Sequence, residues 1–434
     1  MTSQAYPRHM LVLIHGQLSA AGEDHLSQVP LAIPQDVNFL VLKTDLSGLN
    51  GRRAYVSIDW EAETVVQQIL AVLQSCKARQ QPISEISFFG FNMGGLIARY
   101  AVGVLFQMKV FSEIKPRNFD AFGTPHVGLV TPRNRVQQWL IRRVFPRFME
   151  QMAWMDEWEE SGRPVLDVMS DTNSVFFRGL ALFESIRVYA NATGDGMVPY
   201  MSAAIEKSDP FVDYKHSGII VETYDEASRY PALIKSWTFS SSPPNALHPV
   251  LGFFLKTLLR RTSIYVLVLA LIAVLIITGG KIATCILSVL GAFALYLAVI
   301  TLIPAILSFM SIRSQNNRLD AQRRRLLDMS SVFPTSDELA EDGSRLVPSR
   351  TPETSKSSVP TTAPSTTSKT ASHLTPLQLH AITNLNTLPQ LHKELVWRPG
   401  CFTPHRALLG LGTFGKPSFE RGGILRHWGD GLLY

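Results

Sequence analysis

A polar side chain flanked by glycines stands at the centre of residues 90–95, Gly-Phe-Asn-Met-Gly-Gly. The apolar run 86–89 predicts a buried strand, and the apolar periodicity of 96–105 predicts a helix. A strand that turns sharply into a helix over small residues has the layout of a nucleophile elbow, G-x-S-x-G, which serves acyl transfer. Here the central residue is Asn92, and a carboxamide cannot be deprotonated to attack an ester as a serine hydroxyl does. The spacing predicts an acyl-transfer scaffold without its usual nucleophile.

An acid and a base follow in the order that such a site requires. Asp195 lies on a Gly-Asp-Gly loop after the predicted strand 186–190, where a triad acid would sit, but the same loop is also an ordinary turn. His405 follows the predicted strand 394–397 at loop distance, which makes it the preferred base. The other late histidines lie too close to Asp195, before the strand or in a predicted helix; they are His216, His392 and His427, respectively.

Two backbone amides are candidates for an oxyanion hole. A His-Gly pair ends the apolar run 10–14, and a loop of this kind offers one N–H, which here belongs to Gln17. The second N–H comes from the residue after the nucleophile position, Met93. A His-Gly pair alone is a weak signal, and it gains weight from its place before a second predicted strand, 37–42.

The elements that would position these residues alternate between strands and helices. This order favours an α/β fold with a mostly parallel sheet and helices on both faces. The predicted strands cover 10–14, 37–42, 86–89, 118–123, 186–190 and 394–397, and the predicted helices cover 62–78, 96–105 and 424–428. His126, on the loop after 118–123, is expected near the site, where a structural role in the pocket wall is favoured over catalysis.

A segment rich in Trp, Phe, Met and Arg forms a lid-like insertion at about 133–160. One interpretation is an amphipathic lid that meets lipid or covers an acyl pocket. The other is a cap packed permanently on the sheet. The residues leave both open.

Two apolar runs, 264–278 and 282–310, are separated by Gly-Gly-Lys, and Lys281 is the only charged residue between 264 and 310. Basic residues flank both outer ends, so the positive-inside rule predicts a hairpin that spans or is embedded in a membrane with both ends in the cytosol. A buried core hairpin is the less favoured alternative. The predicted domains are a hydrolase domain over 1–255, the hairpin over 262–312, a basic and then Ser/Thr/Pro-rich disordered linker over 313–375, and the C-terminal part of the hydrolase domain over 376–434.

Charge and cysteine content limit the other function classes. The 434 residues carry 41 Lys and Arg against 35 Asp and Glu, a net charge of +6, and the basic residues cluster beside the apolar runs. A membrane surface is therefore expected as a partner, and nucleic acid is not. The three cysteines, Cys76, Cys285 and Cys401, have neither metal-ligand nor disulfide-framework spacing, which favours a reducing, cytosol-facing compartment. The N-terminus shows no secretory signal.

Taken together, these motifs resemble the serine esterase/lipase-like family of the α/β-hydrolases, which includes fungal phospholipases associated with lipid droplets. The stretches that carry the resemblance are 11–16, 86–103, 118–128, 188–200 and 384–428. The family's elbow is G-H-S-x-G-G, and this chain has Phe91 and Asn92 in place of the His and Ser. The resemblance implies an α/β-hydrolase fold that cleaves carboxylic esters of lipids without a metal or cofactor, with Asp195 and His405 at the acid and base positions.

Two functions remain open at this point. The first is a membrane-associated lipase or phospholipase-like serine esterase that acts on lipid or phospholipid esters at the cytosolic face of a lipid droplet or the endoplasmic reticulum. The second is a catalytically inactive lipid-binding or regulatory protein of the same fold. Asn92 suits the second, because asparagine tolerates the positive φ of an elbow while lacking the hydroxyl. Retention of Asp195 and His405 argues mildly for the first.

Overall fold

The structure is a computed structural model, and it divides into two compact units. The first comprises Met1–Val212, Val221–Trp237 and Gln315–Tyr434, and the second comprises Asp213–Ile220 and Thr238–Ser314. The residues that the structure describes are 8–16, 26–34, 38–44, 57–130, 138, 147–158, 161–225, 229–240, 288, 291, 374–401, 403–411 and 423–434.

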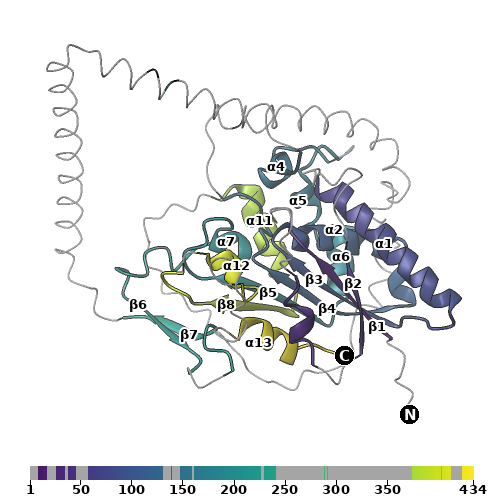
Figure 1. Ribbon diagram of the computed structural model, residues 1–434. Helices are drawn as coiled ribbons and strands as arrows, with labels where there is room; N and C mark the ends of the chain where they lie inside the picture. The colour runs from purple at the N-terminus through teal and green to yellow at the C-terminus, as the bar shows by residue number, and fades with distance from the viewer. Residues whose placement is uncertain are drawn as a thin grey trace. The chain divides into compact units, whose positions relative to one another are not determined.

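A six-stranded sheet with the order β2-β1-β3-β4-β5-β8 forms the centre of the first unit (Figure 1). Every pair of neighbouring strands in it is parallel, as the alternation of elements predicts. Parallel pairing places the carboxyl ends of all six strands at one edge, where the loops that bind ligands lie. The strands are β1 (His9–Ile14), β2 (Phe39–Lys43), β3 (Glu85–Phe91), β4 (Lys115–Phe122), β5 (Ser185–Asn191) and β8 (Leu391–Val396).

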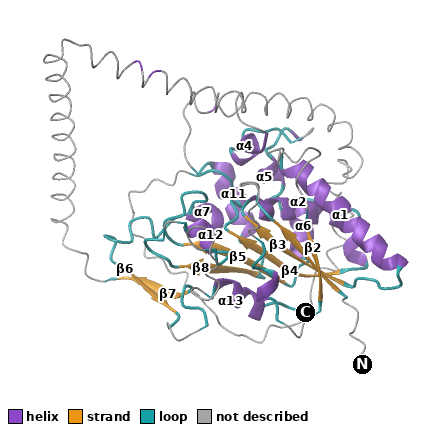
Figure 2. Ribbon diagram, in the orientation of Figure 1, coloured by secondary structure: helices purple, strands orange, loops and turns teal. Residues whose placement is uncertain are grey.

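Helices cover both faces of this sheet, and each face has its own apolar core (Figure 2). Successive residues of a strand point to opposite faces, so Val12 joins one core and Leu13 the other. The helices of the first core are α1 (Ile58–Ala78), α2 (Met93–Gln107), α5 (Val165–Val168), α6 (Val175–Ala181) and α11 (Pro376–Leu385). The second core contains α13 (Ile424–Asp430), in which Trp428 is fully buried. The predicted α/β layering is therefore confirmed.

Several short elements lie outside the elements predicted from periodicity. Of these, α11 has a clear local signal: Thr375 and Gln378 form a capping box, and Pro376 occupies the first turn. Gln378 also donates two hydrogen bonds to the carbonyls of Val127 and Leu129, which anchors α11 beside the loop after β4. The remaining elements are α7 (Tyr200–Ala203), α12 (Pro404–Ala407), the 3-10 turns Pro30–Ala32 and Val110–Ser112, and a two-stranded sheet of β6 (Ile219–Thr223) and β7 (Ile234–Phe239).

The described part of the insertion at 133–160 is packed against the rest of the first unit. It contains α4 (Arg147–Met152), and its Gln151 side chain accepts a hydrogen bond of 2.8 Å from the backbone amide of Ile58. Trp158 is fully buried, and its indole N–H donates to the Tyr100 hydroxyl at 3.3 Å. These contacts are those of a packed cap. Residues 131–137, 139–146 and 159–160 lie outside the described residues.

The membrane hairpin predicted at 262–312 lies outside the described residues except for Ser288 and Gly291. The linker predicted at 313–375 also lies outside them, apart from its last two residues. Among the residues described, no helix combines the length and apolar character needed to cross a bilayer.

Candidate active site

Asn92 stands between the last residue of β3 and the first residue of α2, as the elbow motif predicts. Its backbone has φ 53° and ψ −124°, and its amide donates a hydrogen bond of 2.9 Å to the Phe122 carbonyl. The positive φ favours asparagine over most residues, but this ψ lies outside the left-handed helical region, and such a conformation costs about 1–3 kcal/mol. The surrounding structure therefore holds Asn92 in a strained turn.

Glycines allow the strand and the helix of this turn to approach closely. A Cβ atom on Gly94 would lie 2.1 Å from the Ile14 carbonyl oxygen of β1. A Cβ atom on Gly90 would lie 2.5 Å from the Cα atom of Gly95. Both clashes are with backbone, which cannot move aside as a flexible side chain can. The glycines of the motif are thus required by the packing of α2 against β1 and β3.

The structure brings three predicted site residues into one chain of hydrogen bonds. Asn92 Nδ2 lies 2.8 Å from His405 Nε2, and His405 Nδ1 lies 2.9 Å from Asp195 Oδ2. The residues come from the end of β3, the first turn of α12 and the loop after β5. Asn92 is 6% exposed and His405 is 4% exposed. This is the arrangement of a Ser-His-Asp triad with a carboxamide in place of the hydroxyl.

The partners of His405 determine which ring nitrogen carries the proton. The Asp195 carboxylate can only accept, so Nδ1 carries the proton and donates it to Asp195. Nε2 of the neutral ring then accepts a hydrogen bond, and the Asn92 amide nitrogen donates it. His405 is therefore held in the tautomer that a triad base needs.

Asp195 is held as a carboxylate by its hydrogen bonds. Burial by itself would raise the pKa of Asp195, but the hydrogen bond and charge of His405, the Val198 amide and the Asn191 side chain lower it below its ordinary value. Oδ1 accepts from the amides of Met197 and Val198 at 2.9 and 3.0 Å, and Oδ2 accepts from Asn191 Nδ2 at 2.8 Å. In the sequence, the only signal for Asn191 is its place at the end of β5.

The imidazole of His405 is also positioned by packing. The Phe91 ring centroid lies 4.9 Å from that of His405. On Gly123, which has φ 54°, a Cβ atom would come within 2.8 Å of His405 Cε1. Phe91 and the backbone of Gly123 thus hold the ring, and neither contact was foreseen from the sequence.

Of the two predicted oxyanion donors, only Met93 is described. It is the first residue of α2, so its N–H has no acceptor within the helix and is available at the end of the Asn92 turn. Gln17 lies outside the described residues. Gly16, just before it, approaches the site closely, because a Cβ atom there would lie 2.7 Å from Asn92 Cβ.

The other histidines considered as bases lie elsewhere. His392 is inside β8 and not before it, which corrects the predicted start of that strand. Burial and the charge of Arg187 lower the pKa of His427 to about 4, and its Nδ1 is 3.0 Å from the Tyr189 hydroxyl. His216 pairs with Asp213 at 2.8 Å on the surface.

His126 is 2% exposed, and burial together with the charge of Arg99 lowers its pKa well below the ordinary value. Its carbonyl accepts a hydrogen bond of 3.0 Å from Arg99 Nη1. Within the described part of the chain, its ring nitrogens have no hydrogen-bond partner and are not joined to the triad. Its backbone therefore ties the loop after β4 to α2, in keeping with the structural role favoured from the sequence.

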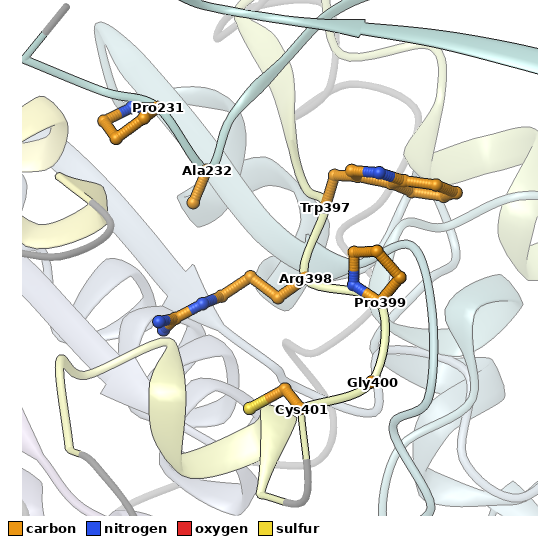
Figure 3. A pocket seen from close by; sticks show the side chains of 7 residues that line it. All are labelled: Pro231, Ala232, Trp397, Arg398, Pro399, Gly400 and Cys401. Atoms are coloured by element: carbon orange, nitrogen blue, oxygen red, sulfur yellow. The ribbon is translucent and has the colours of Figure 1, made fainter. Parts of the chain in front are cut away.

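An open pocket of about 450 Å³ lies on the loop that leads from β8 toward α12. Trp397 and Pro399 lie on one side of it, and the side chains of Arg398 and Cys401 extend toward the other (Figure 3). Pro231 and Ala232 complete the lining, which includes none of the triad residues. The pocket is thus a neighbour of the segment that carries His405 and is separate from the triad itself.

Several solved structures are similar to this chain. Est1E from Butyrivibrio proteoclasticus with bound ferulic acid is 17% identical to this chain, with a TM-score of 0.28. The match covers 46% of this chain and 74% of Est1E. The RedJ thioesterase of the prodiginine pathway from Streptomyces coelicolor is 15% identical over 46% of this chain and 76% of its own, with a TM-score of 0.25.

Curated relatives from two yeasts match by sequence. "Putative lipase C4A8.10" of Schizosaccharomyces pombe is 27% identical over 208 residues, which are 46% of this chain and 26% of the relative. "Putative lipase ROG1" of Saccharomyces cerevisiae is 25% identical over 267 residues, which are 59% of this chain and 35% of the relative. The chain thus spans about a quarter to a third of the length of these relatives.

A family model described as "Putative serine esterase (DUF676)" matches residues 4–208. The matched segment contains Asn92 and Asp195, and it confirms the resemblance inferred from the motifs. Over residues 4–208, this chain is therefore similar to that serine esterase family.

Proposed function

We propose that this chain is a membrane-associated member of the lipase/phospholipase-like serine esterases that binds lipid esters and, with Asn92 at the nucleophile position, hydrolyses them little or not at all. The observation that carries the proposal is the hydrogen bond of 2.8 Å from Asn92 Nδ2 to His405 Nε2. It places a group that cannot act as nucleophile where a triad base would activate one.

The loss of a serine nucleophile is large enough to decide the activity. Removing the nucleophile of such a triad lowers kcat by about 10⁶, or roughly 8 kcal/mol of barrier. What remains, from oxyanion binding and substrate positioning, is a rate about 10³–10⁴ above that in water. This residual activity is too small for lipid turnover. The oxyanion amide of Met93 and the pair Asp195 and His405 would instead serve binding or regulation.

A second candidate, a working lipid esterase, is favoured by one observation. Asp195 and His405 keep the distance, burial and tautomer of an active acid–base pair. A site long without catalytic use has no catalytic reason to hold them. In this alternative, His405 would have to exchange the Asn92 amide for a water molecule and activate that water directly against the ester carbonyl.

Membrane association is part of the proposal because of the runs 264–278 and 282–310 and the basic residues around them. A hairpin inserted from the cytosolic side would keep the hydrolase domain at the surface of a lipid droplet or the endoplasmic reticulum. Lipid or phospholipid esters, the substrates that the family resemblance implies, are concentrated at such surfaces.

The experiment that tests the proposal compares wild type with Asn92→Ser on short-chain and long-chain carboxylic esters. The expected result is negligible hydrolysis by wild type and a gain of about 10³-fold or more in Asn92→Ser. The control is Asn92→Ser combined with His405→Ala, which should lose the gain. Substantial hydrolysis by wild type that disappears in His405→Ala would overturn the inactive form of the proposal and support the esterase. Binding of wild type to vesicles that contain phospholipid, without hydrolysis, supports the lipid-binding role.

A further inference from the structure

We infer that Asn92 is a self-modification site: the backbone nitrogen of Met93 attacks the Asn92 carboxamide, ammonia leaves, and the cyclic imide is opened by water to aspartate and isoaspartate. The inference goes beyond the proposed function, because it requires neither ester hydrolysis nor lipid binding. It rests on the backbone conformation of Asn92 and on the group that faces its leaving nitrogen.

The backbone of Asn92 is already in the conformation that ring closure needs. The imide is a five-membered ring through Met93 N and the C, Cα, Cβ and Cγ atoms of Asn92, so Cβ must be nearly eclipsed with Met93 N. In an L-residue this happens at a ψ of roughly −120°, because Cβ is rotated about 120° from the backbone nitrogen. Asn92 has a ψ of −124°. A helix, at about −42°, or a strand, at about +135°, would separate the two atoms.

The attacking nitrogen, that of Met93, has no hydrogen-bond acceptor within α2. Met93 is the first residue of α2, where an N–H has no carbonyl four residues earlier in the helix to bind. Asn92 is 6% exposed and Met93 is 4% exposed. An intramolecular nucleophile suits so enclosed a side chain, since the first step requires no water in the site.

The leaving nitrogen faces a base that can carry the proton. Asn92 Nδ2 is 2.8 Å from His405 Nε2, and Asp195 lies against the other ring nitrogen at 2.9 Å. As the bond from Met93 N to Cγ forms, the Met93 amide proton passes to His405, and Asp195 stabilises the imidazolium. His405 then returns that proton to Nδ2 as the Cγ–Nδ2 bond breaks and ammonia departs.

Water completes the reaction without any oxidant or reductant. Its addition at Cγ restores the peptide and leaves aspartate, whereas its addition at the backbone carbonyl leaves isoaspartate, with the chain routed through the side chain. The net change is asparagine plus water to a carboxylate plus ammonium, because the departing ammonia takes up the proton that the new carboxyl group releases. At position 92, an aspartate places a negative charge directly beside His405.

Two buried asparagines of the same chain provide matched comparisons. Asn118 lies within β4 and Asn191 ends β5, so both follow the extended backbone of the sheet. Among the described residues, Asn92 is the asparagine with a positive φ. The extended backbone leaves both without the ring-closing ψ. In addition, Asn118 Nδ2 donates to Ser87 and to the Leu433 carbonyl, and Asn191 Nδ2 donates to Asp195, so neither leaving nitrogen faces a histidine. Neither is expected to convert.

The test follows the full-length chain in detergent micelles at neutral pH by peptide mapping and mass spectrometry, with isoaspartate detected separately. The expected products at position 92 are a form lacking one ammonia and then aspartate with isoaspartate, and the oxygen gained should be labelled in heavy-oxygen water. Conversion of Asn92 should be about tenfold or more faster in the native chain than in urea, because folding supplies the orientation. Asn118 and Asn191 should instead convert more slowly in the native chain than in urea.

Two further outcomes decide the route. The folded His405→Ala variant should convert about tenfold or more slowly than wild type, since proton transfer by a placed base contributes at least that much. If this variant does not fold, the comparison of native with unfolded wild type decides the matter. An Asn92 that stays unchanged in the native chain while it converts in urea would overturn the inference. Aspartate without isoaspartate or the ammonia-loss form would also overturn it, in favour of direct attack by water. These mass readouts use no substrate, so they stand or fall separately from the proposed function.

Discussion

Asn92 and His405 are 313 positions apart in the chain, yet the amide nitrogen of Asn92 donates a hydrogen bond of 2.8 Å to Nε2 of His405. The imidazole accepts this bond because Asp195 holds the proton on the opposite ring nitrogen. A histidine and a carboxylate are thus assembled at an elbow whose central residue has no nucleophilic hydroxyl.

The role of Asp195 can be measured in the background of Asn92→Ser. Adding Asp195→Asn should lower kcat by about 10⁴. The amide oxygen would accept from the backbone amides of Met197 and Val198, so the NH2 group would face His405 Nδ1 and stabilise the wrong tautomer. Hydrolysis of a short-chain ester measures the effect. As a control, Glu222→Gln, which alters an exposed ion pair with Lys235, should leave kcat unchanged. An Asp195→Asn enzyme with full activity would contradict the triad assignment.

The lowered pKa of Asp195 predicts a pH-dependent contribution to stability. A carboxyl whose pKa is lower in the folded than in the unfolded chain stabilises the fold above its unfolded pKa of about 3.9, and the benefit is lost as the pH falls through the lowered value. The free energy of unfolding should therefore fall more for wild type than for Asp195→Asn as the pH decreases below about 5. Urea titrations over that range measure it. Parallel curves would show that Asp195 makes no such contribution.

The elbow should not accept a side chain at Gly94. A Cβ atom there would lie 2.1 Å from the Ile14 carbonyl oxygen, so Gly94→Ala must push α2 away from β1. We expect a loss of about 3 kcal/mol or more in the free energy of unfolding. Gly196→Ala is the matched control, because its Cβ would meet nothing within 4 Å, and it should change stability by less than about 0.5 kcal/mol. Equal stabilities of the two variants would contradict the close approach.

A buried ion pair connects the centre of the sheet to the C-terminal helix. Arg187 Nε donates to Asp120 Oδ1 at 2.7 Å, and Trp428 of α13 donates to Asp120 Oδ2 at 2.7 Å. Asp120→Asn would leave the Arg187 charge buried without its partner, so it should lower the free energy of unfolding by about 3–5 kcal/mol.

Thermal or urea unfolding measures this loss. The control is Glu222→Gln, which breaks an exposed pair with Lys235 and should leave stability nearly unchanged. If Asp120→Asn were as stable as the control, the ion pair would be dispensable for holding α13.

Much of the scaffold was predictable because its signals are local. The apolar run before Gly90 and the helical periodicity after Gly95 predicted β3, the turn and α2. A strand and a helix differ in the spacing of their apolar residues within a few positions. The capping box at Thr375 shows that α11 also has a local signal, although α11 is not among the predicted helices. The described part of the insertion was not predictable, because the same amphipathic composition suits a lid or a packed cap.

The sequence by itself determined the elbow, the asparagine at its centre, and the order of Asp195 and His405 after it. Only the tertiary structure decided that His405, and not another late histidine, faces Asn92, and that Asn191, Phe91 and Gly123 hold the acid and the ring. It also revealed the ψ of −124° at Asn92, which nearly eclipses Met93 N with the Cβ atom of Asn92. The reason is physical: apolar spacing records which face of an element is buried, whereas distances between side chains far apart in the chain arise only when the strands and helices pack.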